Sequence, residues 1–311
     1  MRKIKVIFIH GSGRCGSTLL EKLIGNINGL FPIGELGRFW EKAILGGILC
    51  NCKKPALECS FWSNVIKEGV EKGGEDYRKE MSNTEKKVIK ICFFPFLVLP
   101  SMESEDYSKK VNEYVKYLTR IYSSISKFSK NKIIIDSSKN IMYMKILSTL
   151  PQIELYVINL IRDSRAVVYS WQRKKFHPDD IRGEKYMLKW NILPASRRWL
   201  QEYALFPYIK RRCKTYTTLR YEDLIANPKK ELSRVMDELG FNITKKDLSF
   251  IKEDKTVKFK QFHTIWGNPM KFQKGPIKLK LDDEWKTKMP WYKKAIVTAL
   301  TFPLLLKYKY I

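Results

Sequence analysis

The residues with the clearest chemical potential form a glycine-rich loop between an apolar, β-branched run and the start of a helical pattern. Residues 6–9 lead into Gly11-Ser12-Gly13-Arg14-Cys15-Gly16-Ser17-Thr18, and an apolar helical pattern follows. Glycines let backbone N–H groups converge on an anion, and a helix N-terminus adds partial positive charge. The sequence therefore predicts a strand, a phosphate-binding loop and a helix in succession.

The cation of this loop differs from that of a nucleoside-triphosphate P-loop. That motif reads G-x-x-x-x-G-K-[ST], whereas Ser17 stands at the lysine position here and the loop cation is Arg14. The missing lysine argues against a Mg-triphosphate ligand and favours another phosphate-bearing donor. A nucleotide kinase or shikimate-type kinase shares the strand–loop–helix pattern and is the nearest enzyme alternative, but it would need that lysine.

A second anion-binding pair is predicted at the end of another apolar strand. Residues 154–161 deliver Arg162 to the carboxyl end of this strand, and a helix begins close behind it. Ser170 follows eight residues later, about two helical turns, and so returns to roughly the same face. A guanidinium and a hydroxyl placed in this way can bind one phosphate together.

The elements that position these side chains alternate between short strands and helices. Strands are expected at 4–9, 132–136, 154–161 and 215–220, and helices at 17–27, 106–128, 139–149, 164–175, 184–209 and 227–239. Ser137 and Ser138 are expected to cap the helix at 139–149. This alternation predicts an α/β fold with a parallel sheet flanked by helices, and ligands bind at the carboxyl ends of such strands.

Composition limits the class of partner. The chain has 311 residues and a net charge of +27, which favours polyanionic ligands, nucleic acid or an anionic membrane surface. A non-catalytic basic protein bound to membrane or nucleic acid is therefore the alternative from a different class. No recognisable nucleic-acid-binding motif supports it, so a specific nucleic-acid partner is not expected. No feature predicts an oligomeric state.

The cysteines and termini carry weaker information. Cys50, Cys52 and Cys59 could form part of a metal cluster, but their spacing fits no common zinc motif, so no metal is expected. The N-terminus has no signal-peptide pattern, and the apolar run 295–306 is too short to span a membrane, which predicts a cytoplasmic protein. Residues 1–311 are expected to form one domain. Within it, 41–130 would be a mainly helical insertion on the acceptor side and 291–311 a C-terminal amphipathic helix.

Four motifs in this order resemble the sulfotransferases that use 3′-phosphoadenosine 5′-phosphosulfate (PAPS). They are the loop 11–18, Asp136-Ser137-Ser138-Lys139, the segment 160–170 and Arg220-Tyr221-Glu222-Asp223-Leu224. The resemblance covers about 4–40 and 132–290. It implies a P-loop-like sulfotransferase fold and transfer of a sulfuryl group from PAPS to an acceptor hydroxyl, with no obligatory metal.

The resemblance also implies roles for individual residues. Arg14 stands where the cytosolic branch has lysine and the tyrosylprotein and carbohydrate branches have arginine, and it would neutralise charge on the departing oxygen. Arg162 and Ser170 would bind the 3′-phosphate, Tyr221 would contact adenine, and a cation near a glycine in a closing loop would add to the 3′-phosphate site. The implied donor-binding set is Gly11, Ser12, Gly13, Arg14, Cys15, Gly16, Ser17, Thr18, Arg162, Ser170, Tyr221 and Lys271 or Lys274.

The general base is expected to be Glu35. None of the three histidines, His10, His177 and His263, lies in the context in which the cytosolic branch places its catalytic histidine. The pair Gly34-Glu35 resembles the glycine-glutamate of the tyrosylprotein and some bacterial glycan branches, where the glutamate takes the acceptor proton. His263 is second choice, and Asp136 would support Arg162 or a loop backbone.

The acceptor is expected to be a carbohydrate or glycolipid. The aromatic residues in and near 41–130 suit a sugar or lipid but also suit a core, which is the more common outcome; they are Trp40, Phe61, Trp62, Phe93, Phe94 and Phe96. The segment from Trp291 mixes lysines with apolar residues. Packing of this segment as a last helix is favoured, and peripheral contact with an anionic membrane, on the inner face, is the alternative.

Overall fold

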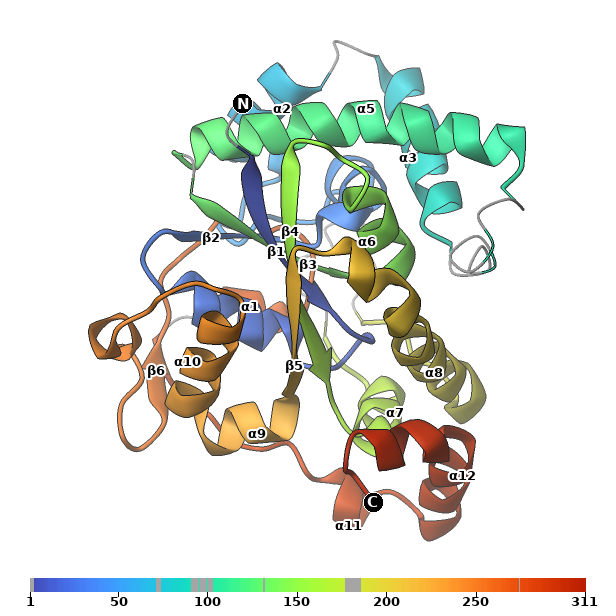
Figure 1. Cartoon of the computed structure of the whole chain (residues 1–311), viewed down its shortest axis with the longest axis vertical. Helices are drawn as coiled ribbons and strands as arrows, with labels where there is room; N and C mark the ends of the chain where they lie inside the picture. The colour runs from blue at the N-terminus through green and yellow to red at the C-terminus, as the bar shows by residue number, and fades with distance from the viewer. Residues whose placement is uncertain are drawn as a thin grey trace.

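A computed structural model describes residues 3–70, 74–90, 95, 99, 103–130, 132–176, 186–273 and 275–311. Its centre is a sheet of five parallel strands in the order β2-β3-β1-β4-β5 (Figure 1). The strands are β1 (Ile4–His10), β2 (Leu30–Gly34), β3 (Ile133–Lys139), β4 (Ile153–Ile161) and β5 (Thr215–Arg220). The predicted parallel α/β sheet flanked by helices is therefore confirmed.

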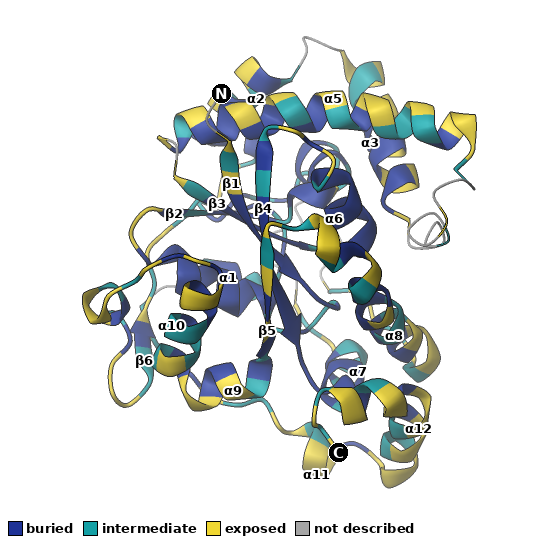
Figure 2. Ribbon diagram, in the orientation of Figure 1, coloured by how far each residue is buried: buried dark blue, intermediate teal, exposed yellow. Residues whose placement is uncertain are grey.

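The central strands β1, β3 and β4 are buried on both faces, as their apolar runs require, whereas the edge strand β5 exposes Tyr216 and Thr218. On β1, Val6 and Phe8 pack into one core while Ile7 and Ile9 pack into the other, because successive side chains of a strand point to opposite faces. Figure 2 shows the central strands almost wholly buried. The first core includes α5 (Glu105–Phe128), α6 (Ile141–Leu147) and α8 (Ile192–Ile209); the second includes α1 (Ser17–Gly25), α9 (Tyr221–Ala226) and α10 (Pro228–Glu238).

The remaining elements surround these layers. The helical segment before α5 holds two 3-10 turns (Leu36–Arg38 and Ala56–Glu58), a π-helical turn (Phe39–Ile44), α2 (Trp62–Gly69) and α3 (Glu75–Val88). After β4 come α7 (Ser164–Gln172) and, later, the antiparallel pair β6 (Thr256–Lys258) and β7 (Pro276–Lys278), then α11 (Trp285–Lys288) and α12 (Trp291–Lys307). Short 3-10 turns lie at Lys210–Arg212, Lys245–Leu248 and Pro269–Phe272.

The structure differs from the sequence prediction at β3 and at β2, and each difference has a physical reason. β3 continues through Ser137 and Ser138, so these residues are not helix caps; instead the Asn140 side chain accepts from the Tyr143 N–H and caps α6. β2 was not predicted. It is a short strand at the edge of the sheet, where Pro32, which cannot donate to a ladder, is tolerated.

The C-terminal segment from Trp291 packs against the rest of the protein as a last helix, as the sequence analysis favoured. Val297, Thr301 and Leu305 are the buried residues of α12, which contacts α7 and α8 (Figure 1). In the part of the chain that the structure describes, no helix combines the length and apolar character needed to cross a bilayer. The organisation of residues 1–311 as one domain remains a prediction.

Candidate functional site

The carboxyl ends of the strands meet at one large cavity. His10, the last residue of β1, pairs in register with Lys139 at the end of β3 and with Asn159 near the end of β4. The cavity at this edge has a volume of about 930 Å³. Its lining includes Gly11, Gly13, Arg14, Gly16, Ser17, Thr18, Glu35, Arg38, Glu41, Lys42, Lys86, Lys139, Arg162, Ser170, Trp171, Lys175, Met187, Trp190, Arg198, Tyr221, Trp266 and Asp282.

The glycine-rich loop forms the floor of this cavity and leads into α1. Gly16 precedes the helix with a φ of 100°, and a Cβ built on it would lie 2.4 Å from the Tyr221 ring. A Cβ on Gly13 would lie 2.5 Å from the Trp171 ring. Two aromatic rings therefore press against the loop at positions where only glycine fits, and α1 directs its first N–H groups toward this space.

Arg14 is the cation of the loop. Its guanidinium lies 4.9 Å from the centre of the Trp171 ring, and one N–H donates to the Met187 sulfur at 3.2 Å. Burial and the nearby charge of Arg173 lower the pKa of Arg14 to about 10, while Glu35 acts in the opposite direction. Arg14 is therefore still charged near neutral pH, in a place where water is scarce, which strengthens its interaction with an anion.

Arg162 and Ser170 reach the same cavity, as the strand-then-helix pattern predicted. The Arg162 guanidinium donates to the Arg14 carbonyl at 3.2 Å and lies 4.6 Å from the centre of the Tyr221 ring. It also donates to the Asp282 carbonyl at 2.9 Å and pairs with the Asp282 carboxylate at 3.3 Å. Asp282 pairs with Arg173 as well, at 2.7 Å. A carboxylate thus already sits where two guanidinium groups converge.

Glu35 lies on the other side of the loop, after β2. Its carboxylate pairs with the Lys139 ammonium at 2.5 Å, and its backbone N–H donates to the Ile265 carbonyl at 3.0 Å. Buried Glu21 of α1 supports this turn by accepting the Gly34 N–H at 2.6 Å and the Ser137 hydroxyl at 2.8 Å. Three separate elements therefore fix the direction in which Glu35 points.

Positive charge dominates the cavity beyond the predicted residues. Burial, followed by the nearby charges of Arg14 and Arg173, lowers the pKa of the Lys175 ammonium to about 8, and Asp282 opposes this shift. An anionic ligand would relieve the mutual repulsion of these cations. The cavity is consequently suited to a ligand that carries several negative charges.

Several predicted residues lie outside the cavity lining. The Ser12 and Cys15 side chains are buried, and the Ser12 N–H donates to the Tyr203 hydroxyl at 3.1 Å. Lys271 is also buried and donates to the Leu49 carbonyl at 2.9 Å, which turns it away from the cavity; Lys274 lies outside the described residues. The expectation that Lys271 reaches a bound phosphate is therefore not supported.

The positions of Asp136 and His263 bear on two further expectations. Asp136 accepts from the Tyr122 hydroxyl at 2.5 Å and from the Ser138 N–H at 2.8 Å, so it anchors β3 and does not orient Arg162. Burial raises its pKa to about 6. His263, second choice as base, does not line the cavity, and its Nδ1 lies 3.1 Å from the Cys59 sulfur. His177 lies outside the described residues.

The structure adds residues that sequence reasoning missed. Lys139 belongs to the motif Asp136-Ser137-Ser138-Lys139, but its partner Glu35 is 104 residues away in the sequence. No local sequence pattern links the two residues. Trp171 directly follows Ser170 on α7, so its contact with the loop was accessible from the helix pattern. Tyr203 and Asp282 come from distant segments and carried no such signal.

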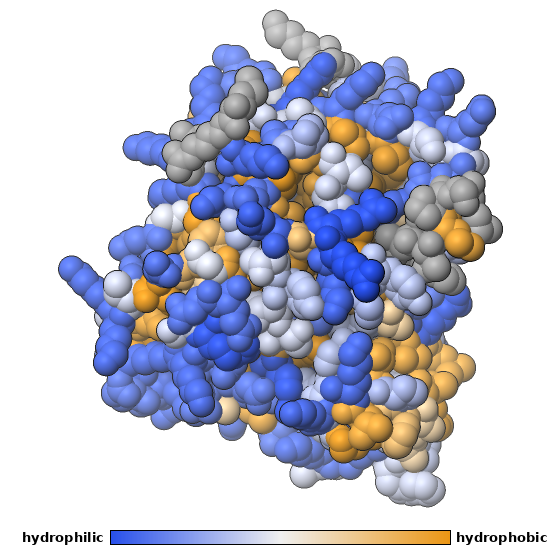
Figure 3. Space-filling view, viewed as in Figure 1, coloured by the Kyte–Doolittle hydropathy of each residue, from blue (hydrophilic) through white to orange (hydrophobic). Residues whose placement is uncertain are grey.

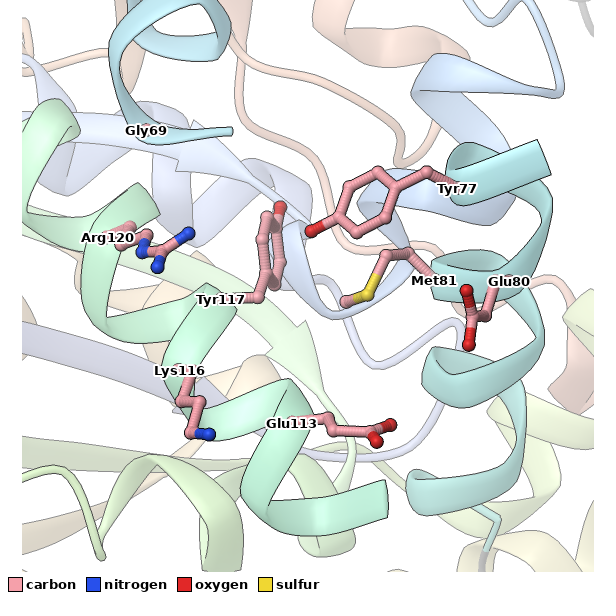
Figure 4. A pocket seen from close by; sticks show the side chains of 8 residues that line it. All are labelled: Gly69, Tyr77, Glu80, Met81, Glu113, Lys116, Tyr117 and Arg120. Carbon is pink, nitrogen blue, oxygen red and sulfur yellow. The ribbon is translucent and has the colours of Figure 1, made fainter. Parts of the chain in front are cut away.

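A second, smaller cavity lies between α3 and α5 (Figure 4) and shares no lining residue with the first. Tyr77 and Tyr117 point toward one another across it, with Met81 beside them. Its lining contains no residue of the glycine-rich loop or of the strand ends. It therefore has no part in the site described above.

Comparison with known proteins agrees with this geometry. The model of a family described as the sulfotransferase family matches residues 6–245. The structure is similar to the sulfotransferase domain from the Synechococcus PCC 7002 olefin synthase, with a TM-score of 0.51, 20% identity and coverage of 98% of this chain and 96% of that one. It is also similar to a sulfotransferase domain from the curacin biosynthetic pathway, with a TM-score of 0.52, 16% identity and 98% coverage of both chains. No curated protein sequence gives a match.

Proposed function

This chain belongs to the sulfotransferase family, and on that premise we propose that it moves a sulfuryl group from PAPS to a hydroxyl of an acceptor. Membership in this enzyme family argues against the two alternatives raised by the sequence, a nucleotide or shikimate-type kinase and a non-catalytic basic protein. The observation that carries the proposal is the convergence of Arg14, Arg162 and Tyr221 on one cavity, with Glu35 across the loop.

The order of the strands supports one orientation of the donor nucleotide across the edge of the sheet. β1 and its loop lie in the middle of the sheet, with β4 and β5 on one side and β3 and β2 on the other. Ligands bind in such sheets where the connections leave in opposite directions. In our proposal, Arg162, Ser170 and Tyr221 bind the 3′-phosphate and adenine on the β4–β5 side. The loop 13–18 binds the 5′-phosphosulfate at the centre.

The reaction then needs one base and one leaving-group cation. The acceptor oxygen attacks sulfur, the bond from sulfur to the 5′-phosphate oxygen breaks, and the acceptor proton passes to the Glu35 carboxylate. Arg14 and the loop N–H groups stabilise the negative charge that develops on the departing phosphate oxygen. Lys139 holds Glu35 in place and adds positive charge to the reacting end. The products are the sulfated acceptor and 3′-phosphoadenosine 5′-phosphate (PAP).

For the acceptor we propose a carbohydrate or glycolipid. Residues of the helical segment 41–130 line the cavity on the Glu35 side, in keeping with the acceptor-side role expected for it. Glu41, Lys42 and Lys86 are charged, Leu45 and Ile48 are apolar, and Lys42 lies 5.0 Å from the centre of the Trp266 ring. Charged groups beside a half-buried aromatic ring suit a ligand with many hydroxyl groups. Arg38, just before this segment, adds a further charge to the same side of the cavity.

Transfer of label from ³⁵S-PAPS to a panel of glycans, glycolipids and small alcohols tests this proposal. We expect label on a sugar hydroxyl, and we expect Glu35→Gln and Arg14→Ala each to lower kcat by roughly 10² or more, because base and leaving-group stabilisation each contribute about that much. Glu68→Gln, which changes an exposed carboxylate on α2, is the control and should keep full activity. Full activity of Glu35→Gln would contradict its role as base.

We also propose that α12 makes a peripheral contact with anionic membrane. Its outer side exposes Trp291, Ile296, Leu300, Phe302 and Leu306, and Figure 3 shows the apolar patch over this corner of the molecule. Lysines at both ends of the helix add charge for anionic headgroups. Co-sedimentation with phosphatidylglycerol vesicles, lost in the double variant Trp291→Ser/Phe302→Ser, is the expected result. Equal pelleting with and without vesicles would contradict it.

A further inference from the structure

Three cysteines and a histidine that the mechanism does not use meet at one point in the fold. Cys50 and Cys52 lie in a tight turn, and Cys59 follows the 3-10 turn Ala56–Glu58. His263 comes from the segment just before Trp266, which lines the cavity. One ligand atom of each residue, three Sγ and an imidazole nitrogen, lies within 4.8 Å of the others. His263 is 204 positions from Cys59, so folding alone brings the set together.

The spacing of these atoms matches a tetrahedral zinc site. With Zn–S bonds of about 2.3 Å and a Zn–N bond of about 2.0 Å, tetrahedral geometry separates two sulfurs by about 3.8 Å and a sulfur from a nitrogen by about 3.5 Å. Cys50 Sγ and Cys59 Sγ are 3.6 Å apart, and His263 Nδ1 lies 3.1 Å from Cys59 Sγ and 3.9 Å from Cys50 Sγ. Cys50, Cys59 and His263 therefore need only small side-chain movements to bind one metal ion, and Cys52 Sγ, within 4.8 Å of the other ligand atoms, would move by up to about 1 Å.

The cluster lies at the boundary between the protein interior and the solvent. Cys50 and Cys59 are fully buried, while Cys52 and His263 are half-buried, which leaves an entry path. Backbone N–H groups of Phe61 and Trp62 donate to the Cys59 sulfur, and that of Cys52 donates to the Cys50 sulfur. These N–H groups direct partial positive charge at the two sulfurs, as they would at metal-bound thiolates.

The histidine is held in a ligating direction by neighbours from the cysteine segment. Its ring stacks on Phe61 with centroids 5.7 Å apart, and the Trp62 indole N–H donates to the His263 carbonyl at 2.6 Å. A disulfide explains the cluster less well. The sulfurs of Cys50 and Cys59 lie well beyond the bonded distance of about 2.05 Å. A disulfide between them would also not explain why Cys52 and His263 lie beside them.

We propose that Cys50, Cys52, Cys59 and His263 bind one Zn²⁺ in a closed, structural site. Three thiolates and one imidazole fill all four tetrahedral positions, which leaves none for a substrate. None of the four residues lines the catalytic cavity. The site is therefore independent of whether the sulfotransferase proposal holds for any given acceptor.

Such a metal would fasten one wall of the active site. The Asn51 N–H, between the two first cysteines, donates to the Thr264 carbonyl at 2.9 Å, and the Ile265 carbonyl accepts from Glu35 at 3.0 Å. Trp266, next in the chain, lines the cavity. Zinc at His263 would thus fix the segment that positions the candidate base, without touching substrate.

The test is the metal content of the full chain, expressed with zinc in the medium, purified, and dialysed against a weak chelator. Elemental analysis should find about one zinc per chain in the wild type and in Cys213→Ser, which removes a half-buried cysteine outside the cluster. Cys52→Ser and His263→Asn should retain less than about a tenth of that amount, because each removes one of four ligands. A wild type without zinc, or cluster variants that keep it, would overturn the proposal.

Two further measurements use the wild-type protein and so test the site even if the cluster variants fold poorly. Wild-type protein refolded with Co²⁺ in place of Zn²⁺ should show the visible absorption bands of tetrahedral, thiolate-bound cobalt. Peptide mapping without reductant should find Cys50 and Cys59 as free thiols after the metal is removed. A Cys50–Cys59 disulfide in freshly purified wild type, or cobalt spectra of octahedral form, would contradict a closed zinc site. None of these readouts depends on sulfotransferase activity.

Discussion

At the scale of single residues, the cavity depends on cations whose charges repel one another until an anion binds. Arg14 and Lys175 both have lowered pKa values because they are buried near other cations. The two pKa values differ enough that a change of pH can neutralise Lys175 while Arg14 stays charged. Arg14, at about 10, stays charged at pH 8, whereas Lys175, at about 8, is then half neutral.

This difference predicts a pH dependence of donor binding. As pH rises from about 7 to about 9, Lys175 passes from mostly charged to mostly neutral, so affinity for PAP should fall, by up to about tenfold if only the cation binds. Titration calorimetry of PAP across this range measures the effect. Lys175→Met should bind more weakly at pH 7 and lose most of the dependence. An unchanged slope in that variant would assign the titration to another group.

The residues that could be predicted are those whose partners are close in sequence. The loop 11–18 and the pair Arg162 and Ser170 were found because a strand end and a helix start fix their positions within a few residues. Lys139 as the partner of Glu35, and His263 as the neighbour of Cys59, required chain segments that only the folded sheet brings together. The spacing of the cysteines alone argued against a metal site. His263, the fourth candidate ligand, is too distant in sequence to be included in a spacing motif.

At the scale of elements, the start of α1 is the feature on which the donor site depends most. Gly16 has positive φ and lies under the Tyr221 ring, so it is constrained by both backbone and packing. Gly29 has a φ of 84°, and a Cβ there would meet no atom within 4 Å. The two positions therefore separate backbone strain from steric conflict.

Substitution of these two glycines by alanine should give different results. Gly29→Ala should cost about 1 kcal/mol of unfolding free energy from left-handed backbone strain, with unchanged PAP affinity. Gly16→Ala should cost about 1–3 kcal/mol and also weaken PAP binding at least tenfold (about 1.4 kcal/mol or more), because Tyr221 must move away from the loop. Urea denaturation and calorimetry measure both quantities. Normal PAP binding by Gly16→Ala would contradict the contact.

Most elements followed from sequence patterns, and the exceptions have identifiable causes. Four of the five sheet strands matched apolar runs, and the long amphipathic helix expected at 106–128 is α5. β2 was missed because it is only five residues long and contains Pro32. The helix expected from 184 begins at Ile192, after a stretch that lines the cavity with Met187 and Trp190.

At the scale of the whole molecule, strand order turns separate motifs into one site. The phosphate loop lies in the middle of the sheet, the pair Arg162 and Tyr221 to one side and Glu35 to the other. The net charge of +27 adds a long-range attraction for polyanions, but it does not choose among them. In our proposal, the choice depends on two anion-binding regions held at a fixed separation by the strands.

The central claim is that these two regions bind a nucleotide with phosphate on both sides of its ribose. Calorimetry of wild-type protein with PAP and with adenosine 5′-phosphate, which lacks only the 3′-phosphate, tests it most directly. We predict that PAP binds at least tenfold more tightly. Arg162→Ala should weaken PAP by about 10- to 100-fold, the value of one or two charged hydrogen bonds, and remove the preference.

Arg234→Ala, which changes an arginine on α10 outside the cavity, serves as the control and should bind PAP as the wild type does. Thermal denaturation of each variant verifies that it is folded. Equal affinity of the wild type for the two nucleotides, or an Arg162→Ala variant that is folded and binds PAP normally, would contradict the account.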